Sequence, residues 1–408
     1  MRSVAVVGAS LAGLAAARTL RAHGFDGRIT LIGQEARPPY DRPPLSKEFL
    51  LSGTSVEELA LTTDDDESLD IDWRLGTIAT ALDPHGRRIT LSDGGEVRAD
   101  AAVLATGARA RTLPWADGLS GVHTLRTLDD ALALRASLRS GGPLVVIGAG
   151  FIGSEVASTA LAAGVDVTVV EALPVPLAGA LGAEMGSTCA ALHSDHGVRL
   201  LCGIPVRGLL AGRGGGPPPR SAGGTSDRRV TAVQLTDGTV LPAATVLVGI
   251  GAVPNTEWLA GSGLSVRDGV LTDPHCATSL PNVVAVGDCA ASYLPAAARH
   301  VRTEHWTHAL RQPETAVRTL LAGDGGTGPT RAPLPYFWSE QYGVRIQFAG
   351  NRREGDSVRI EEGTPEDRSF LAVYERDGRP TAILGMNRSK QFTRWRHQLA
   401  AEWANVPA

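Results

Sequence analysis

The stretch Val145–Glu171, VVIGAGFIGSEVASTALAAGVDVTVVE, decides the fold of this chain. An apolar run, Leu144–Ile147, leads into the turn GAGFIG at residues 148–153, and a segment of helical character follows. A second apolar run, Val167–Val170, ends on Glu171. This order of strand, glycine-rich turn, helix, strand and acid predicts a βαβ unit that binds a dinucleotide. An ordinary βαβ unit, whose glycines serve packing only, is the alternative interpretation.

Each glycine of this turn has its own physical role. Gly148 allows a tight turn, and Gly150 lets the backbone approach a pyrophosphate that sits on the partly positive helix N-terminus. Gly153 lets the helix pack closely on the strand. Glu171, eighteen residues after Gly153, can accept hydrogen bonds from an adenosine ribose and would repel a 2′-phosphate. Because no arginine follows in the next two positions, this acid favours NADH over NADPH.

The N-terminus repeats this pattern in a variant form. A strand is expected at Val4–Val7, the turn GASLAG follows at residues 8–13, and a second strand is expected at Arg28–Ile32. Ser10 replaces the middle glycine, and serine is small enough for a pyrophosphate still to approach the backbone. Glu35 follows where a ribose-binding acid belongs. The sequence therefore predicts two dinucleotide sites.

An internal repeat supports two copies of one nucleotide-binding architecture. Residues 88–107, RITLSDGGEVRADAAVLATG, and residues 230–251, VTAVQLTDGTVLPAATVLVGIG, share one pattern. Each has an alternating strand, an Asp-Gly turn, a second strand and a buried apolar strand that ends on glycine. The chain then returns with an apolar strand at Val283–Val286, which ends on Gly287-Asp288 and completes the first copy. The second copy is thus expected to be inserted into the first.

These patterns predict an α/β fold with two Rossmann-like dinucleotide-binding domains, one inserted in the other, and a small α+β C-terminal domain. We expect the outer domain at 1–111 and 253–323, the inserted domain at 112–252 and the C-terminal domain at 324–408. Further expected elements are a helix at Arg126–Arg139 capped by Thr127–Asp129, a disordered Gly/Pro/Ser-rich excursion at 211–227, a linker at 323–329, strands at Val344–Ala349, Phe370–Tyr374 and Thr381–Leu384, and a final helix at Lys390–Trp403.

Composition limits the class of protein. At 408 residues with 43% hydrophobic content, the chain is long enough for two or three domains with their own cores. The net charge of −4 gives no electrostatic reason to expect nucleic acid or an anionic membrane as a partner. The first strand begins almost at the first residue, and no apolar run reaches the length of a membrane-spanning helix. We therefore expect a cytoplasmic protein.

Cysteine and lysine usage adds two expectations. The four cysteines form no CxxC pattern, so we expect buried apolar residues rather than a redox or metal site at Cys189, Cys202, Cys276 and Cys289. Nearly all basic residues are arginine, and lysine occurs only at Lys47 and Lys390.

Several motifs together point to one family. Besides the two glycine-rich turns, the chain has the strand ends Ala105-Thr106-Gly107 and Val286-Gly287-Asp288. Three further segments are RPPYDRPPLSK at Arg37–Lys47, Glu304-His305-Trp306 and Tyr336-Phe337-Trp338-Ser339. With them, the whole chain resembles the two-dinucleotide flavoprotein reductases, and among these the NADH-dependent ferredoxin reductases of the oxygenase-coupled, putidaredoxin reductase-like type. The resemblance implies FAD in the outer copy, NADH in the inserted copy, and a C-terminal domain that covers the flavin and helps to receive an iron–sulfur ferredoxin.

The resemblance also implies roles for individual residues. The FAD pyrophosphate would be held by Gly8, Ser10 and Gly13, with Glu35 at the ribose and Arg42 at the phosphates. Asp288 would contact the ribitol, Lys47 would lie near flavin N5, and Trp306 would lie near the isoalloxazine. Further FAD contacts would be Ala105, Thr106, Gly107, Arg109 and Glu304. NADH would contact Gly148, Gly150, Phe151, Ile152, Gly153, Glu171 and Gly251. A buried lysine needs an anionic partner because an unpaired ammonium is costly there, and we predict Glu155 as the counter-ion of Lys47.

The implied reaction is hydride transfer from NADH to FAD, then single-electron transfer to a 2Fe–2S or 3Fe–4S ferredoxin that serves a cytochrome P450 or a Rieske dioxygenase. Lys47 would stabilise negative charge on the reduced flavin, and Glu155 would position Lys47. Disulfide reductases of this fold need a nucleophilic cysteine beside the flavin, and Pro39–Leu51 contains none. A rubredoxin reductase and a signalling flavoprotein of the apoptosis-inducing-factor type are the alternatives. A monomer and a weak homodimer are both open.

Overall fold

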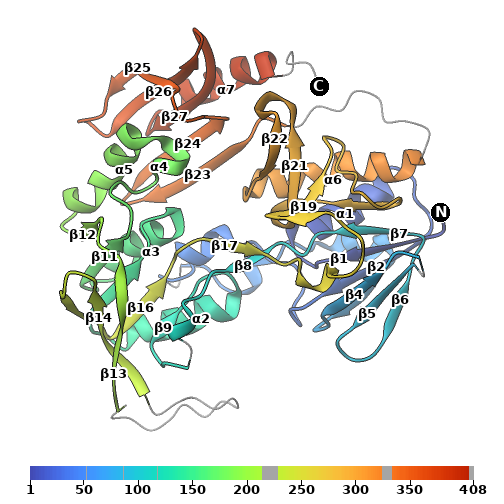
Figure 1. Cartoon of the computed structure of the whole chain (residues 1–408), viewed down its shortest axis with the longest axis horizontal. Coiled ribbons are helices and arrows are strands. Elements are labelled where there is room, and N and C mark those ends of the chain that lie inside the picture. Colours follow the sequence, from blue (N-terminus) through green and yellow to red (C-terminus); the bar gives the residue numbers. More distant parts are fainter. Residues whose placement is uncertain (52, 86, 117, 214–227, 324–332, 404–408) are drawn as a thin grey trace.

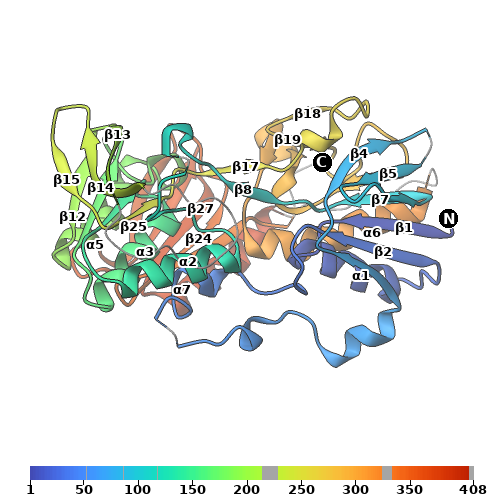
Figure 2. The same cartoon turned by 90° about the horizontal axis from the view of Figure 1, so that it is seen from below.

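The computed structural model describes residues 1–51, 53–85, 87–116, 118–213, 228–323 and 333–403. Two parallel five-stranded sheets form two separate units, and a five-stranded antiparallel sheet from the C-terminal part of the chain lies against the second unit (Figure 1). Two short strands, β8 (Ala108–Ala110) and β17 (Ala252–Pro254), pair antiparallel and run between the two units (Figure 2).

The first unit is built on the sheet β20-β7-β1-β2-β3, whose strands are Val283–Ala285, Ala101–Leu104, Ser3–Val7, Arg28–Gly33 and Ile71–Leu75. Because successive strand residues point to opposite faces, Val4 and Val6 pack in the core beneath the helices α1 (Leu11–Ala22) and α6 (Trp306–Ala322). Ala5 and Val7 pack in a second core, beneath the small sheet of β4 (Ala79–Asp83), β5 (Arg88–Leu91) and β6 (Glu96–Arg98).

The second unit repeats these layers on the sheet β12-β11-β10-β16-β9, whose strands are Arg199–Cys202, Val167–Glu171, Leu144–Ile147, Thr245–Val248 and Val122–His123. Leu144 and Val146 face the core that contains α2 (Leu128–Arg139) and α3 (Phe151–Ala162). Val145 and Ile147 face the small sheet of β13 (Val206–Arg213), β14 (Arg228–Leu235) and β15 (Val240–Pro242). Both units therefore have a parallel sheet between helices and a three-stranded antiparallel sheet.

The predicted repeat and insertion are both confirmed. Strands β5, β6 and β7 of the first unit correspond to β14, β15 and β16 of the second, in the order that the repeat predicts. After the second unit, β20 returns to the first sheet and pairs in parallel with β7, with Val283 opposite Ala102. The fold class predicted from the sequence is therefore correct.

The C-terminal sheet, β23-β24-β27-β26-β25, has the strands Tyr336–Gln341, Val344–Gly350, Arg379–Met386, Ser369–Arg376 and Ser357–Thr364. One face packs on α7 (Ser389–Trp403) through Phe392 and Leu399. The other face packs on α4 (Ala178–Leu181) and α5 (Ala183–Asp195) of the second unit through Leu181 and Met185. A further sheet in the first unit contains β18 (Val266–Arg267), β19 (Gly269–Thr272), β21 (Ala290–Leu294) and β22 (Arg299–Arg302).

Most predicted element positions hold, two differ, and one lies almost entirely outside the described residues. The helix expected at Arg126–Arg139 begins at Leu128, because the Thr127 side chain accepts from the Asp130 N–H and caps the first turn. Residues 211–213 are not part of an irregular excursion, because they extend β13 and pair with β14; residues 214–227 lie outside the described residues. Of the expected linker at 323–329, only Gly323, which ends α6, is described. The strands β23 and β25 were not predicted.

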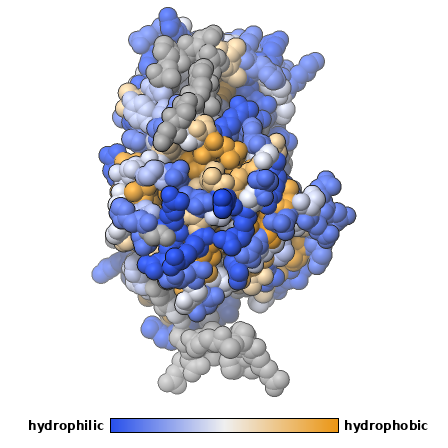
Figure 3. Space-filling view, turned by 90° about the vertical axis from the view of Figure 1, so that its right-hand side faces the viewer, coloured by the Kyte–Doolittle hydropathy of each residue, from blue (hydrophilic) through white to orange (hydrophobic). Residues whose placement is uncertain are grey.

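Three of the four cysteines, Cys189, Cys276 and Cys289, are buried as expected, and Cys202 is half-buried. None of the described helices is long and apolar enough to cross a lipid bilayer. The end of the molecule formed by the first unit is mostly hydrophilic, with a hydrophobic area near the middle of this face (Figure 3).

Stability should fall as the pH falls from about 6.5 toward 4, partly through His193. This side chain is 1% exposed, with Nδ1 2.7 Å from Tyr342 Oη and Nε2 3.2 Å from Ser154 Oγ. Burial lowers the pKa of His193 from 6.5 to about 4. As the pH falls below 6.5, the unfolded chain binds a proton at this residue before the folded chain does, so the contribution of the neutral histidine to the free energy of unfolding is lost between pH 6.5 and 4. Thermal unfolding measured across this pH range should show a smaller fall in the free energy of unfolding for His193→Gln than for the wild type. A slope equal to that of the wild type, or of the exposed control His397→Gln, would contradict this assignment.

Candidate active site

The first glycine-rich turn joins β1 to α1 at the carboxyl edge of the first sheet. Gly8 has φ +122°, and a Cβ there would lie 2.0 Å from the carbonyl oxygen of Ala105 at the end of β7. A Cβ on Gly13 would lie 1.8 Å from the carbonyl oxygen of Gly8. Among the described residues, no side chain caps the first turn of α1, which begins after Ser10. Its N–H groups can therefore meet an anion such as a pyrophosphate.

Glu35, just beyond β2, is held by two side chains from the loop that follows. Its Oε1 accepts from Arg42 Nη2 at 2.8 Å and its Oε2 accepts from Tyr40 Oη at 2.6 Å. Arg42 also donates from Nε to Ser10 Oγ at 3.4 Å and from Nη1 to the carbonyl of Arg126 at 2.6 Å. The structure thus brings together the predicted site residues Ser10, Glu35 and Arg42. The sequence reasoning missed Tyr40, although it lies within the quoted segment RPPYDRPPLSK.

Asp288 follows β20 and lies near the end of β7. Its Oδ2 accepts from Arg126 Nη2 at 2.6 Å, and Arg126 Nε donates to the carbonyl of Ala108 at 2.9 Å. Thr106 is tied to Asn255 in both directions, by Oγ1 to the carbonyl of Asn255 at 2.7 Å and by Asn255 Nδ2 to the carbonyl of Thr106 at 2.9 Å. Gly107 has φ +64° and ends the strand. Arg126 was not among the predicted site residues, because its partner is 162 residues away in sequence.

Two aromatic residues from distant segments meet beside this edge. Trp306 begins α6 and donates from Nε1 to Asp41 Oδ1 at 2.7 Å. Its ring lies edge-on to that of Trp338 on β23, with centroids 6.0 Å apart. Burial raises the pKa of Asp41 even though the indole N–H favours its charged form. The C-terminal sheet therefore reaches the first unit through Trp338.

Two predicted FAD residues lie in ion pairs, one exposed and one at a cavity. Arg109, on β8, donates to Glu257 Oε1 at 2.6 Å and to Asn255 Oδ1 at 3.2 Å. Glu304, which precedes α6, accepts from Arg302 Nη1. The Arg109 guanidinium is thus directed at the β17 side of the connection between the units, whereas Glu304 lines a cavity described below.

The second glycine-rich turn has the same geometry as the first. A Cβ on Gly148 would lie 2.3 Å from the carbonyl oxygen of Gly249, and one on Gly153 would lie 2.1 Å from that of Gly148. Gly150 differs from both, because a Cβ there would meet no described atom within 4 Å. Glu171 lies over this turn and accepts from the N–H groups of Ala149 and Leu173, both at 2.9 Å. The open space at Gly150 and the acid beside it fit a dinucleotide.

The remaining predicted NADH residues lie around this turn in different environments. Ile152 is 45% exposed, and Gly251 has φ +102° with open space where a Cβ would be. The ring of Phe151 instead packs on Phe337 of β23, with centroids 4.6 Å apart. Phe151 therefore connects the second turn to the C-terminal sheet.

Lys47 and Glu155 form the ion pair that the sequence predicts. Lys47 follows the short 3₁₀ helix Pro43–Ser46, and its Nζ lies 2.8 Å from Glu155 Oε2 and 3.1 Å from the carbonyl oxygen of Pro43. Glu155, on α3, is 3% exposed. Ser46 Oγ donates to Glu155 Oε2 at 2.5 Å, and Ser339 Oγ of β23 donates to Oε1 at 2.7 Å. The two serines were missed, although both lie in quoted motifs.

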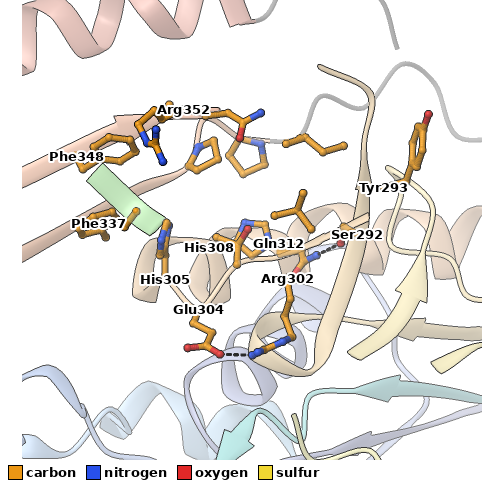
Figure 4. Close-up of a pocket in the computed structure, with 18 of the residues that line it drawn as sticks. Ser292, Tyr293, Arg302, Glu304, His305, His308, Gln312, Phe337, Phe348 and Arg352 are labelled. Atoms are coloured by element: carbon orange, nitrogen blue, oxygen red, sulfur yellow. Dashed lines mark hydrogen bonds and ion pairs between the residues drawn. The ribbon is translucent and has the colours of Figure 1, made fainter. Parts of the chain in front are cut away.

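A cavity of about 320 Å³ lies between α4, α6, the strands β21 and β22, and the C-terminal sheet (Figure 4). His305 and His308 line it, and the Nδ1 atom of each is buried with no hydrogen-bond partner among the described residues. Burial lowers the pKa of both histidines to about 4, so both are neutral at pH 7. Figure 4 shows the Arg302–Glu304 pair on one side of the cavity and Phe337 and Phe348 on another. The neutral rings offer hydrogen-bonding atoms to a ligand.

Two glycine-rich turns, each with an acid at or just beyond the end of its second strand, and a Lys–Glu pair with a buried carboxylate between the units define the class of two-dinucleotide oxidoreductases. The model of the pyridine nucleotide-disulphide oxidoreductase family matches residues 2–313, and the reductase C-terminal model matches residues 336–408. The chain therefore belongs to the pyridine nucleotide-disulphide oxidoreductase family, as an oxygenase-coupled ferredoxin reductase of the putidaredoxin reductase-like type.

Individual relatives agree over nearly the whole chain. The sequence is 38% identical to rhodocoxin reductase of Rhodococcus erythropolis, over 99% of this chain and 91% of that protein. It is 36% identical to putidaredoxin reductase of Pseudomonas putida, over 96% of this chain and 90% of that protein. The crystal structure of the covalent putidaredoxin reductase–putidaredoxin complex superposes with a TM-score of 0.90 at 34% identity, over 98% of this chain and 93% of that one. The predicted family and enzyme class, a ferredoxin reductase, are confirmed.

Alanine at Gly150 and at Gly153 should separate dinucleotide binding from folding. Gly150→Ala meets open space, so thermal unfolding should be unchanged, while the methyl group blocks a phosphate and raises the KM for NADH by roughly tenfold. Gly153→Ala drives a Cβ against the Gly148 carbonyl and should lower the free energy of unfolding by about 1–3 kcal/mol. Both effects can be measured by calorimetry and steady-state kinetics on the two variants, with Gly208→Ala as a control in open space. Equal losses of stability at both positions would refute it.

Proposed function

We propose that this chain takes hydride from NADH and passes single electrons, through FAD, to an iron–sulfur ferredoxin that serves an oxygenase. The observation that supports it best is the buried Lys47–Glu155 pair, because it joins a loop of the first unit to the helix that follows the second glycine-rich turn. On this proposal, two dinucleotides bound on the two turns would bring their reactive ends together beside that cation.

The proposal assigns one cofactor to each unit. Residues 1–111 and 253–323 would hold FAD through the turn at Gly8–Gly13, Glu35 and Asp288, and residues 112–252 would hold NADH through the turn at 148–153 and Glu171. Residues 324–408 would form the interface domain. A cytoplasmic location and a monomer or weak homodimer complete the proposal.

When bound, FAD supplies the chemistry that accepts a hydride and releases electrons singly. The residues of this chain bind, orient and stabilise. The Lys47 ammonium would stabilise negative charge on the adjoining ring, and the Glu155 carboxylate keeps that ammonium in place. Thiol chemistry is disfavoured, because burial raises the pKa of Cys189 and Cys276 to about 12 and that of Cys289 and the half-buried Cys202 in the same direction.

Ferredoxin as the electron acceptor is supported by the relatives, which include rhodocoxin reductase and the ferredoxin reductase component of chlorobenzene dioxygenase. Exposed Arg311 on α6 offers a face of positive charge to an acidic partner, whereas the exposed Arg318 and Arg394 already pair with Glu314 and Glu362 and would have to exchange those partners. Arg302 does not belong to such a face, because its side chain is 11% exposed and pairs with Asp268 and Glu304.

Electron delivery is tested by NADH-driven reduction of cytochrome c with the FAD-reconstituted protein. We expect fast reduction when a 2Fe–2S or 3Fe–4S ferredoxin is added and slow reduction without it. The 2Fe–2S and 3Fe–4S carriers should be measured separately, since the chain's preference between them is open. Equal support by a rubredoxin would favour the rubredoxin reductase alternative. Slow turnover with every carrier would favour a signalling flavoprotein of the apoptosis-inducing-factor type.

Glu171 should decide between NADH and NADPH. Its carboxylate is held 2.9 Å from two backbone N–H groups over the glycine-rich turn, where it would repel a 2′-phosphate. Glu171→Ala combined with Ala172→Arg should lower kcat/KM for NADH and raise it for NADPH, each by about tenfold, because a charge repulsion is replaced by a phosphate-binding cation. A wild-type protein that already prefers NADPH would show that this residue does not select the coenzyme.

A further inference from the structure

The carboxylate of Glu155 receives donors from two other parts of the chain. Glu155 lies on α3 and is 3% exposed. Oε2 accepts from Lys47 Nζ at 2.8 Å and from Ser46 Oγ at 2.5 Å, both on the loop of the first unit. Oε1 accepts from Ser339 Oγ at 2.7 Å, on β23 of the C-terminal sheet. Within the described residues, Ser339 is the one hydrogen-bond donor to Oε1.

The direction of the bond from Ser339 is set by its other neighbour. Gln341 Nε2 donates to Ser339 Oγ at 3.1 Å, so the single hydroxyl proton of Ser339 is left for Glu155. Ser339 is 0% exposed and Gln341 is 1% exposed, so water does not compete for these groups. The result is a buried chain of donors that ends on the carboxylate.

Strand alternation explains why one strand reaches both sides of this junction. Ser339 and Gln341 are two residues apart and point to the same face of β23, toward Glu155 on α3. Trp338 points to the opposite face, where it contacts Trp306 and stacks on Tyr336. A single strand of the C-terminal sheet thus contacts both the ion pair and the aromatic residues at the start of α6.

We propose that Ser339, oriented by Gln341, is a positioning residue for hydride transfer: it fixes the Glu155 carboxylate and thereby the Lys47 ammonium. The inference rests on the proposed function and extends it, since it places part of the control of the hydride-transfer site in the C-terminal domain. Without the Ser339 hydroxyl, Oε1 of this buried carboxylate loses its donor while Oε2 keeps Lys47 and Ser46, and a buried acceptor atom left unsatisfied is costly. Glu155 then holds Lys47 less firmly.

Lysine labelling measures this effect directly, with or without FAD. The chain has only two lysines, Lys47 and Lys390, so a pulse of acetic anhydride followed by peptide mass spectrometry gives their relative reactivity within one sample. Ser339→Ala should raise the ratio of Lys47 to Lys390 acetylation by about tenfold, the expected effect of one lost hydrogen bond to a charged group. Ser339→Thr keeps the hydroxyl and should restore the wild-type ratio.

The matched control is Ser158→Ala. Ser158 lies one helical turn from Glu155 and its Oγ accepts from the N–H of Tyr342 at 2.6 Å, so it also links α3 to the C-terminal sheet but does not contact the ion pair. Its labelling ratio should equal that of the wild type. In stopped-flow experiments, Ser339→Ala should slow flavin reduction at saturating NADH by about tenfold with little change in NADH affinity, and Ser158→Ala should not.

Labelling tests the positioning role of Ser339, and flavin reduction by NADH tests the proposed function. An unchanged labelling ratio in Ser339→Ala, or an equal rise in Ser158→Ala, would overturn the positioning role, because the effect would then be absent or only structural. If NADH fails to reduce the flavin of the wild type, the proposed function is wrong and the role in hydride transfer falls with it. The labelling of the apoprotein still decides, in that case, whether Ser339 holds the ion pair.

Discussion

The structure depends on a buried carboxylate that its own helix does not satisfy. Glu155 lies on α3, and the donors that the described residues offer it come from Ser46 and Lys47 of the first unit and Ser339 of the C-terminal sheet. A buried charge is tolerated only when it is paired and hydrogen-bonded. The three parts of the chain must therefore meet in one arrangement. This requirement makes the junction between them well defined, which hydride transfer between two bound rings needs.

Two copies of one unit become an asymmetric active site through a loop that only the first copy carries. In the second copy, Glu171 is held by backbone N–H groups. In the first copy, Glu35 is held by Tyr40 and Arg42, which belong to the loop after β2. The same loop continues to Lys47 and packs against α2 of the second unit. The repeated architecture thus supplies two dinucleotide-binding turns, and the loop after β2 supplies the Lys47 cation between them.

The sequence predicted the features that follow from a residue pattern or from an unpaired charge, and it missed the partners that neither reveals. The glycine turns and the returning strand follow from spacing and apolar patterns, and the Lys47–Glu155 pairing followed from the cost of a buried ammonium. The donors Ser46 and Ser339, which lie 109 and 184 residues from Glu155, were missed because a serine hydroxyl, unlike the Lys47 ammonium, carries no charge that requires a partner. Strand β25 was missed because it is an edge strand with many charged residues. Residues 211–213 were not predicted as strand because they contain a glycine, and only their pairing with β14 shows that they extend β13.

We expect the two coenzymes to meet beside the ion pair that joins the three parts of the chain. A crystal structure of the FAD-loaded protein with NAD⁺ bound tests it most directly. The nicotinamide C4 should lie within about 3.5 Å of flavin N5, with Lys47 at the edge of the flavin and still in contact with Glu155. Rings that meet away from Lys47, or an empty second glycine-rich turn with NAD⁺ bound elsewhere, would contradict it.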